Sequence, residues 1–316
     1  MRIGFLGFGE AGFHIAKGLL SHGAEEMVAY DINSETLGRG EIIQRRAAEA
    51  SVRLTRTNAE LAGATDTLFS VVTCDQALAA ARQTVSHLEP RHHYADLNSV
   101  SPSVKQALAA VIQPSGARFV EIAVMAPVPP YGHTVPMLAG GHAAADLVSM
   151  LAPFGMRVEV ASSEIGVAAA TKMFRSIMIK GMEALITECV LAAGRYGAAE
   201  RVFASLAETY PGIDWPAMAD YCVGRVVVHG ERRAREMEEV AETLRSLDIE
   251  PIMAEATARR MDWSAQNGLK ARFSGQPPNS YSDLVDAVFQ PAGRDWGRNA
   301  NHQSGTELDR LTRIDQ

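Results

Sequence analysis

Short apolar runs and longer amphipathic stretches alternate along the first half of this 316-residue chain. Short apolar runs bounded by polar and glycine residues are typical of buried strands, and a helical spacing of apolar residues is typical of amphipathic helices. Strands are expected at residues 3–6, 27–30, 67–72, 94–97, 118–124 and 135–139, and helices at 34–50, 75–88 and 102–113. Strands that alternate with helices predict a parallel sheet that helices cover on both faces.

The pattern changes after residue 163, where strand signals almost disappear. Residues 164–195 have the pattern of one long helix without proline, and further helices are expected at 198–209, 215–228, 232–247 and 252–263. We therefore predict an α/β fold in which residues 1–163 form a doubly wound parallel sheet and residues 164–316 form an all-helical domain. The long helix is the expected joint between the two domains.

Glycine residues mark the turn between the first strand and the helix that follows it. Gly7, Gly9 and Gly12 have the spacing G-x-G-x-x-G directly after the apolar run. The first glycine permits a tight turn, the second lets a pyrophosphate approach the backbone, and the third lets the helix pack closely on the strand. The N-terminus of that helix also attracts phosphates. This arrangement predicts a dinucleotide-binding Rossmann domain; a glycine-rich turn that serves only packing is the alternative.

Asp31 ends the second strand, about 20 residues after the glycine turn, where a carboxylate accepts hydrogen bonds from the adenosine ribose. A 2′-phosphate would meet a like charge there, so the sequence favours NAD. Arg39, Arg45 and Arg46 follow in the next helix and keep NADP as the alternative cofactor. The expected cofactor-binding residues are Gly7, Phe8, Gly9, Glu10, Ala11, Gly12, Asp31, Thr73 and Asn98.

Composition and charge narrow the class of protein. The net charge is −7 and the basic residues form no long run, so neither nucleic acid nor an anionic membrane is an expected partner. Cys74, Cys189 and Cys222 are an odd, widely spaced set without a metal-binding motif, which indicates a reducing cytoplasm and no metal site. The chain enters a strand at its start, so no signal peptide is expected. No apolar stretch has the length expected of a membrane span.

Three further stretches carry candidate chemistry. They are D-L-N-S-V-S-P at 96–102, E-I-A-V-M-A-P at 121–127 and G-V-A-A-A-T-K-M-F-R-S at 166–176. Together with the glycine turn, and in this order, they resemble the motifs of the β-hydroxyacid dehydrogenase superfamily, which includes 3-hydroxyisobutyrate and 6-phosphogluconate dehydrogenases. The stretch H-G-E-R-R-A-R-E-M-E-E-V at 229–240 resembles the C-terminal domain of a less characterised phosphogluconate-dehydrogenase-like branch.

The resemblance implies an NAD(P)-dependent oxidoreductase that transfers a hydride between the nicotinamide and a small anionic substrate, a hydroxy acid or sugar acid. Lys172 then matches the active-site lysine on the long helix, as acid and base for the substrate hydroxyl. Ser176 takes the place of the family's catalytic asparagine, and Ser99 with Asn98 would lie beside the nicotinamide ribose and the substrate. An imine or other carbonyl reductase is the alternative in the same class. A dinucleotide-binding regulatory protein without turnover is the alternative in another class.

The third motif departs from the family pattern D-x-P-V-S-G-G, whose small residues admit a substrate carboxylate. Residues 125–127 are Met-Ala-Pro instead of Ser-Gly-Gly, and the proline has no N–H to donate. Arg175, next to the lysine motif, carries a cation that suits a carboxylate or phosphate. The expected substrate-binding residues are Met125, Ala126, Arg175, Tyr131 and His133. For Tyr131 and His133, an exposed loop position is the alternative.

Other positions carry weaker signals. His92 and His93 lack ligand spacing and are expected in an exposed turn. His229 and the arginines after it are expected at the start of a helix, as an anion site or a solvated face. Three aromatic residues are expected in the helical core: Trp215, Tyr221 and Trp263.

The long helix is richer in apolar residues than a single exposed joint requires. Its apolar positions include Ile177, Met178, Leu185, Ile186 and Val190. We therefore expect a homodimer whose interface is formed mainly by residues after 164.

Overall fold

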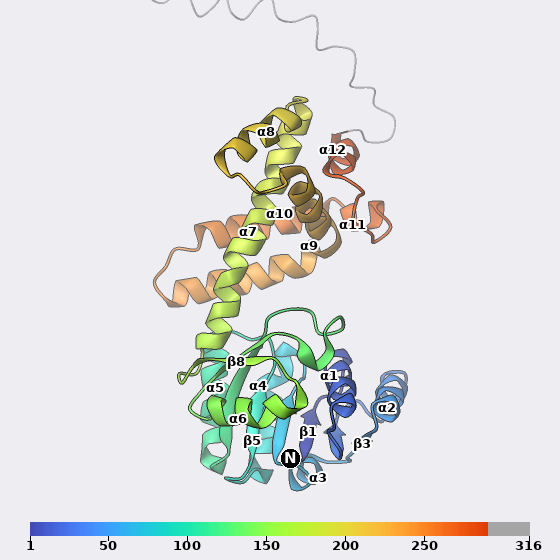
Figure 1. Ribbon diagram of the computed structural model, residues 1–316, viewed down its shortest axis with the longest axis vertical. Helices are drawn as coiled ribbons and strands as arrows, with labels where there is room; N and C mark the ends of the chain where they lie inside the picture. Colours follow the sequence, from blue (N-terminus) through green and yellow to red (C-terminus); the bar gives the residue numbers. More distant parts are fainter. Residues whose placement is uncertain (290–316) are drawn as a thin grey trace, which may run out of the picture. The chain divides into compact units, whose positions relative to one another are not determined.

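The computed structural model describes residues 1–289 and divides into two compact units, Met1–Ser176 and a second unit that begins at Ile177. The units divide within the long helix, whereas the sequence pattern placed the domain boundary before it, at residue 163. Residues 290–316, the end of the expected helical domain, lie outside the described residues. Figure 1 labels the helices and strands.

The first unit is built on an eight-stranded sheet with the order β3-β2-β1-β4-β5-β6-β7-β8. The strands are β1 (Ile3–Leu6), β2 (Met27–Tyr30), β3 (Val52–Leu54), β4 (Thr67–Ser70), β5 (His93–Asp96), β6 (Arg118–Val124), β7 (Met137–Gly140) and β8 (Val158–Ser162). Neighbouring strands of this sheet are parallel except for β6 and β7, which pair antiparallel. The strand order reverses between β1 and β4, which opens a crevice at the carboxyl ends of these strands.

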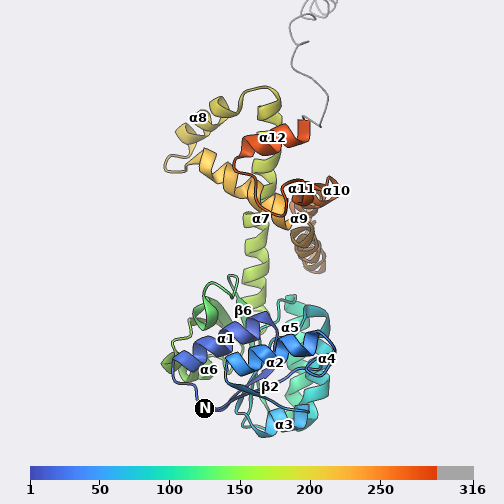
Figure 2. The same ribbon diagram turned by 90° about the vertical axis from the view of Figure 1, so that its right-hand side faces the viewer.

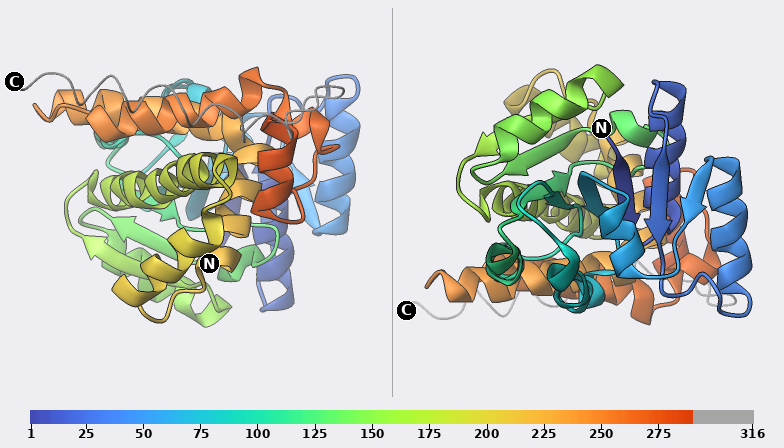
Figure 3. Two further views of the ribbon diagram at one scale, coloured as in Figure 1. Left: turned by 90° about the horizontal axis from the view of Figure 1, so that it is seen from above. Right: turned by 90° about the horizontal axis from the view of Figure 1, so that it is seen from below.

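Helices cover both faces of the sheet, as the sequence predicted (Figure 3, right). One face packs against α1 (Glu10–Ser21), α2 (Arg39–Glu49) and α6 (Ala144–Leu151). The other face packs against α3 (Asn58–Gly63), α4 (Ala77–Thr84) and α5 (Pro102–Ile112). Side chains alternate between the two cores along each strand, so that Phe5 enters the first core and Leu6 the second. Short 3-10 turns lie at Cys74–Gln76, Val85–His87, Gln113–Ser115, Gly132–Thr134 and Ala152–Phe154.

The second unit is helical (Figures 1 and 2). The helix α7 (Val167–Arg195) begins in the first unit and continues into the second, which also contains α8 (Ala199–Thr209), α9 (Trp215–Ser246), α10 (Ile252–Gln266), α11 (Leu269–Arg272) and α12 (Tyr281–Phe289). Its core includes Val190, Phe203, Val227 and Leu284. Within residues 1–289, no helix combines the length and apolarity that crossing a membrane would require.

The expected break between two helices at His229 is wrong, because α9 runs through it without interruption. Gly230 serves close packing instead: a Cβ at this residue would lie 2.6 Å from the backbone oxygen of Met261 in α10. The basic residues from His229 onward therefore lie in the middle of a helix, where its N-terminal dipole has no influence on them.

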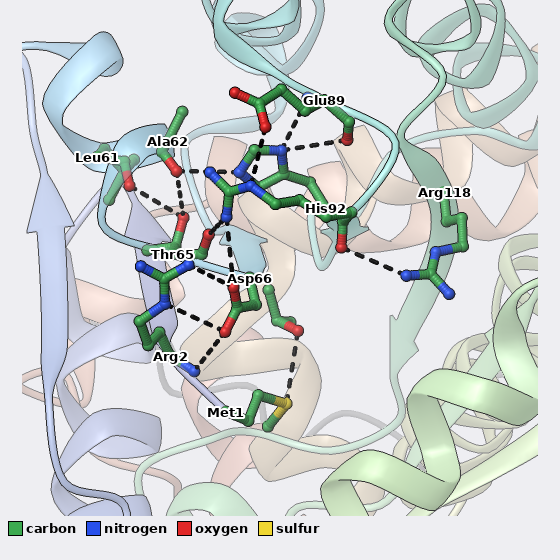
Figure 4. A network of polar contacts seen from close by, with 11 residues as sticks. Met1, Arg2, Leu61, Ala62, Thr65, Asp66, Glu89, His92 and Arg118 are labelled. Atoms are coloured by element: carbon green, nitrogen blue, oxygen red, sulfur yellow. Dashed lines mark hydrogen bonds and ion pairs between the residues drawn. The ribbon is translucent and has the colours of Figure 1, made fainter.

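The exposed turn expected at His92 and His93 is also wrong, since both side chains are buried. The ring of His92 accepts the Glu89 N–H at Nδ1, at 2.8 Å, and its Nε2 lies 3.0 Å from the carbonyl oxygen of Ala62 (Figure 4). Two backbone partners on opposite sides of the ring make this a structural histidine. Among the three aromatic residues expected in the helical core, Trp215 and Trp263 pack against it, but Tyr221 is 60% exposed.

The expected helix from residue 34 begins later, at Arg39. The Asp31 carboxylate accepts the Asn33 N–H at 2.9 Å, which holds the chain in a turn after β2. Gly38 then adopts a φ of 77° as the N-cap residue of α2, so the helix begins after it and not at residue 34. The polar patterns of β3 and β8, the two outermost strands, gave no strand prediction.

Candidate active site

The glycine turn after β1 has the geometry that a bound pyrophosphate requires. Gly7 has a φ of 87°, and its N–H donates to the Tyr30 carbonyl at 2.8 Å. A Cβ at Gly9 would meet no atom within 4 Å, so the backbone there faces open space. A Cβ at Gly12 would lie 3.3 Å from the Gly7 oxygen, where the helix packs on the turn. Gly9 is the N-cap residue of α1 and has no side chain that could cap the helix. The first N–H groups of α1 therefore face this space.

A pocket of about 480 Å³ opens beside this turn, entirely within the first unit. Its lining includes six of the predicted cofactor-binding residues: Gly7, Gly9, Glu10, Ala11, Asp31 and Thr73. The side chain of Phe8 is buried in the core, so only its backbone is available at the turn. The pocket, the open backbone at Gly9 and the uncapped helix together fit a dinucleotide.

Asp31 is held in place at the edge of this pocket. One carboxylate oxygen accepts the Phe8 N–H at 2.7 Å and the other accepts the Asn33 N–H at 2.9 Å. Arg39 and Arg46 line the same pocket, which brings two of the three arginines considered from the sequence next to the acid.

Lys172 and Ser99, two of the predicted catalytic residues, lie within hydrogen-bond distance. The Lys172 ammonium donates to the Ser99 hydroxyl at 2.6 Å. Ser99 follows the carboxyl end of β5, and Lys172 lies in the second turn of α7. The thiol of Cys74, which the sequence did not single out, donates to the Ser99 carbonyl at 3.1 Å.

Ser176 and Arg175 lie one turn beyond Lys172 on the same helix. The Ser176 hydroxyl donates to the Lys172 backbone carbonyl at 3.3 Å, so it bonds the helix backbone instead of the ammonium. The Arg175 side chain is exposed.

The start of α7 is fixed by Glu121, a buried residue of β6. Its Oε1 accepts the N–H groups of Gly166, at 2.7 Å, and Ala168, at 3.1 Å. A carboxylate at a helix N-terminus satisfies unpaired donors and complements the helix dipole. The sequence identified Glu121 as the acid of the third motif, but it gave no sign of this capping role.

Buried charges lie close to Ser99 along the chain, at the end of β5 and in α5. Lys105, in α5, is 1% exposed and pairs with Asp96 at 2.5 Å. Asn98 in turn donates to Asp96 at 2.5 Å. Asn98 was predicted from the sequence, but Lys105 was missed. A signal was present, because Lys105 shares a helical stripe with the buried Leu108 and Ile112.

The substrate-binding residues expected between 125 and 133 have different surroundings. The Met125 N–H already donates to the Pro136 carbonyl at 2.9 Å, and Ala126 packs partly against the core. Tyr131 is 48% exposed. His133 is 5% exposed and packs against α1, with its ring centroid 4.3 Å from that of His22. Burial, and secondarily the nearby His22, lowers the pKa of His133.

A further pocket, of about 620 Å³, lies in the second unit beside α9 and α11. His229 and Arg232 line it together with Lys270 of α11. Burial first, and then the surrounding cations, lower the pKa of His229. Arg232 is paired with Glu236 at 2.5 Å.

Comparison with known proteins agrees with this geometry. Residues 2–160 match the NAD binding domain of 6-phosphogluconate dehydrogenase, and residues 193–264 match a domain of unknown function, DUF1932. The chain is 36% identical to a conserved hypothetical protein from Sinorhizobium meliloti 1021, covering 91% of this chain and 95% of that one, with a TM-score of 0.81.

Two further solved structures are similar. The conserved protein MTH1747, of unknown function and described as similar to 3-hydroxyacid dehydrogenases, is 32% identical over 87% of this chain and 99% of its own, with a TM-score of 0.73. The 3-hydroxyisobutyrate dehydrogenase of Mycobacterium tuberculosis, solved with L-serine, shares the fold at 14% identity, with coverages of 91% and 99% and a TM-score of 0.70. This chain therefore belongs to the family of the NAD binding domain of 6-phosphogluconate dehydrogenase, within the β-hydroxyacid dehydrogenase superfamily.

Proposed function

We propose that this chain is an NAD(P)-dependent oxidoreductase that interconverts the hydroxyl and carbonyl forms of a small hydroxy acid or sugar acid, with Lys172 as its acid and base. The observation that supports this most directly is the 2.6 Å contact between Lys172 and Ser99 beside the carboxyl end of β5. Two polar hydrogen-bonding side chains that meet at this edge of a doubly wound sheet lie where such folds bind their ligands.

The proposed roles follow from the chemistry of each side chain. When bound, a nicotinamide dinucleotide accepts or returns the hydride of the carbinol carbon. The neutral amine of Lys172 takes the hydroxyl proton during oxidation, and its ammonium returns a proton and stabilises the oxyanion during reduction. Ser99 orients the lysine by hydrogen bonding. Ser176 supports the helix backbone at Lys172, and the exposed Arg175 offers a cation to an anionic group of the substrate.

NAD remains the expected cofactor, with NADP as the alternative. Asp31 presents a fixed carboxylate, which suits ribose hydroxyls and repels a 2′-phosphate. Arg39 and Arg46 in the same pocket supply the competing attraction for a phosphate. The ratio of the two dissociation constants, measured by calorimetry, decides between them.

One observation favours the imine or other carbonyl reductase as the second candidate. The Met125 N–H is already bonded and residue 127 is proline, so this stretch offers few donors to a substrate carboxylate. A substrate whose reacting carbon lies far from a carboxylate, or that lacks one, would not need those donors.

The function is tested by following the absorbance of the reduced cofactor. The purified protein is given NAD or NADP with a panel of hydroxy acids and sugar acids, and NADH or NADPH with the matching carbonyl compounds and imines. Turnover with a hydroxy acid or its carbonyl form supports the proposal. Turnover with imines alone favours the reductase. Cofactor binding without turnover in either direction favours the regulatory alternative.

A further inference from the structure

Ser70, Asp96, Asn98 and Lys105 form a buried polar network, and Asn98 directly precedes Ser99 in the chain. We propose that Lys105 is a positioning residue: through Asp96 it fixes the side-chain amide of Asn98, so that the Asn98 oxygen is presented as an acceptor to a hydroxyl of the nicotinamide-side ribose. This inference rests on the proposed function, because it assumes that a dinucleotide occupies the crevice.

The Lys105 ammonium uses all three of its donors inside the protein. It donates to Oδ2 of Asp96 at 2.5 Å, to the backbone oxygen of Asp96 at 2.7 Å and to the carbonyl of Ile122 at 3.3 Å. A buried ammonium is stable only beside a compensating charge, and the Asp96 carboxylate supplies that charge. Lys105 thereby holds the Asp96 carboxylate in place as an acceptor.

The charge on Asp96 decides which way the Asn98 amide points. An ionised carboxylate accepts hydrogen bonds and donates none, so the amide must turn its NH₂ group toward it. The structure has this arrangement, with Nδ2 of Asn98 donating to Oδ1 of Asp96 at 2.5 Å and to the Ser70 hydroxyl at 3.0 Å. With a neutral partner in place of Asp96, either orientation of the amide would be satisfied.

The remaining polar atom of the Asn98 amide is its oxygen, which can accept a hydrogen bond. Asn98 is 4% exposed, and its Oδ1 is buried without a hydrogen-bond partner among the described residues. A buried carbonyl oxygen of this kind is costly unless a ligand or ordered water satisfies it. Since Asn98 is fixed on its NH₂ side, the ligand must bring an O–H or N–H group.

The position of Asn98 in the sheet indicates which part of a dinucleotide supplies that group. Asp31 follows β2 on one side of the glycine turn, where the adenosine ribose is bound. Ser70 ends β4 and Asn98 follows β5, and both strands lie on the other side of β1. A dinucleotide that crosses the switch point therefore places its second ribose, with two hydroxyl donors, on the Asn98 side.

The test compares affinities for two probes by calorimetry. ADP carries the adenosine and pyrophosphate only, whereas NADH or NADPH also carries the second ribose; whichever dinucleotide the wild type binds more tightly is used. In Asn98→Ala and Lys105→Met, the dinucleotide affinity is expected to fall by roughly three- to tenfold, equivalent to one lost hydrogen bond. ADP affinity should stay within about twofold of wild type, since the contacts on the adenosine side do not involve this network.

Two further variants keep the test decisive. Lys105→Met leaves Asp96 buried and unpaired, so it is expected to lower the melting temperature. The double variant, Lys105→Met with Asp96→Asn, removes both charges together. It should show the same selective loss of dinucleotide affinity. Thr65→Val is the matched control: it deletes a buried hydroxyl bonded to Leu61 at 2.9 Å, before the amino end of β4, and should leave both affinities unchanged.

Each outcome separates the inference from the proposed function. A selective loss of dinucleotide affinity in Asn98→Ala and the double variant supports the positioning role of Lys105. Unchanged affinities, or parallel losses for ADP and dinucleotide, overturn it, because a merely structural role weakens both. A wild-type chain that binds neither probe contradicts the proposed cofactor site itself.

Discussion

At the residue scale, Gly9 offers the sharpest test of the cofactor site. Its Cα faces open space beside the start of α1, which is where a pyrophosphate is expected to lie. Gly9→Val would fill that space without a clash inside the protein, so the variant should fold normally and lose measurable dinucleotide binding in calorimetry. Gly63→Val is the matched control, since a Cβ at Gly63 would likewise meet no atom within 4 Å and this residue lies away from the pocket. Equal cofactor affinity in the two variants would remove the glycine turn from the site.

His133 is expected to make the folded chain less stable at acidic pH. Burial and the neighbouring His22 lower its pKa below 6.5, so it stays neutral in the folded chain while the unfolded chain takes up a proton. Its contribution to stability is therefore present above pH 6.5 and is lost as the pH falls below that value. His133→Asn should reduce the loss of melting temperature between pH 7.5 and pH 5.5. Buried His93, whose pKa is also lowered, should leave part of that loss in place.

The exposed His142 supplies the control for this measurement. His142→Asn should keep the pH dependence of the wild type. An equal pH dependence in His133→Asn and wild type would show that His133 does not titrate as its surroundings indicate.

At the element scale, the attachment of α7 to the sheet is expected to govern the position of Lys172. Glu121→Ala removes the acceptor of two backbone N–H groups at the start of this helix and should destabilise the first unit by about 1–3 kcal/mol. Small displacements of a catalytic group lower rates strongly, so turnover should fall by up to about 100-fold. Thermal unfolding and steady-state kinetics check both effects. The exposed Glu164 provides a control: Glu164→Ala should change neither, and a Glu121→Ala protein with normal turnover would contradict the anchoring role.

The elements that the sequence predicted well are those with a clear pattern of apolar residues. The central strands are apolar and buried, so β1, β2 and β4 were found close to their observed bounds. The edge strands β3 and β8 carry exposed polar residues such as Arg53 and Glu159, and their pattern is that of a loop. The sequence pattern placed a break between two helices around residue 230, whereas Gly230 lies inside α9 and allows the close approach of α10, which no local pattern reveals.

At the scale of the whole molecule, we predict a homodimer formed mainly by residues after 164. Part of the expected apolar stripe is used within the chain, since Val190 is buried in the core of the second unit and Ile186 packs against it. Met178 and Leu185 of α7 remain exposed, as does Tyr221 of α9. A homodimer interface over this part of the chain would bury these side chains together, as a contiguous apolar patch. Light scattering at micromolar concentration should give twice the mass of the chain, and Leu185→Glu should shift it toward the monomer; a monomeric wild type would contradict the prediction.

The candidate site was predictable to the extent that its residues belong to sequence motifs. The glycine turn, Asp31, Ser99 and Lys172 could be named because spacing and order carry the information, and the structure places Ser99 beside Lys172. Lys105 and the role of Glu121 depend on contacts between distant segments, which one sequence does not encode locally.

The measurement that tests the account most directly is the turnover of Lys172→Met, with the substrate and cofactor found in the activity survey. Methionine keeps the apolar stem and removes the ammonium that donates to Ser99. Turnover should fall by about 10²–10⁴-fold, the range expected for a positioned acid or base, while cofactor affinity stays close to that of wild type. The exposed Lys17→Met variant should retain full turnover. Turnover of Lys172→Met within a few-fold of wild type would contradict the assignment of Lys172 as the acid and base.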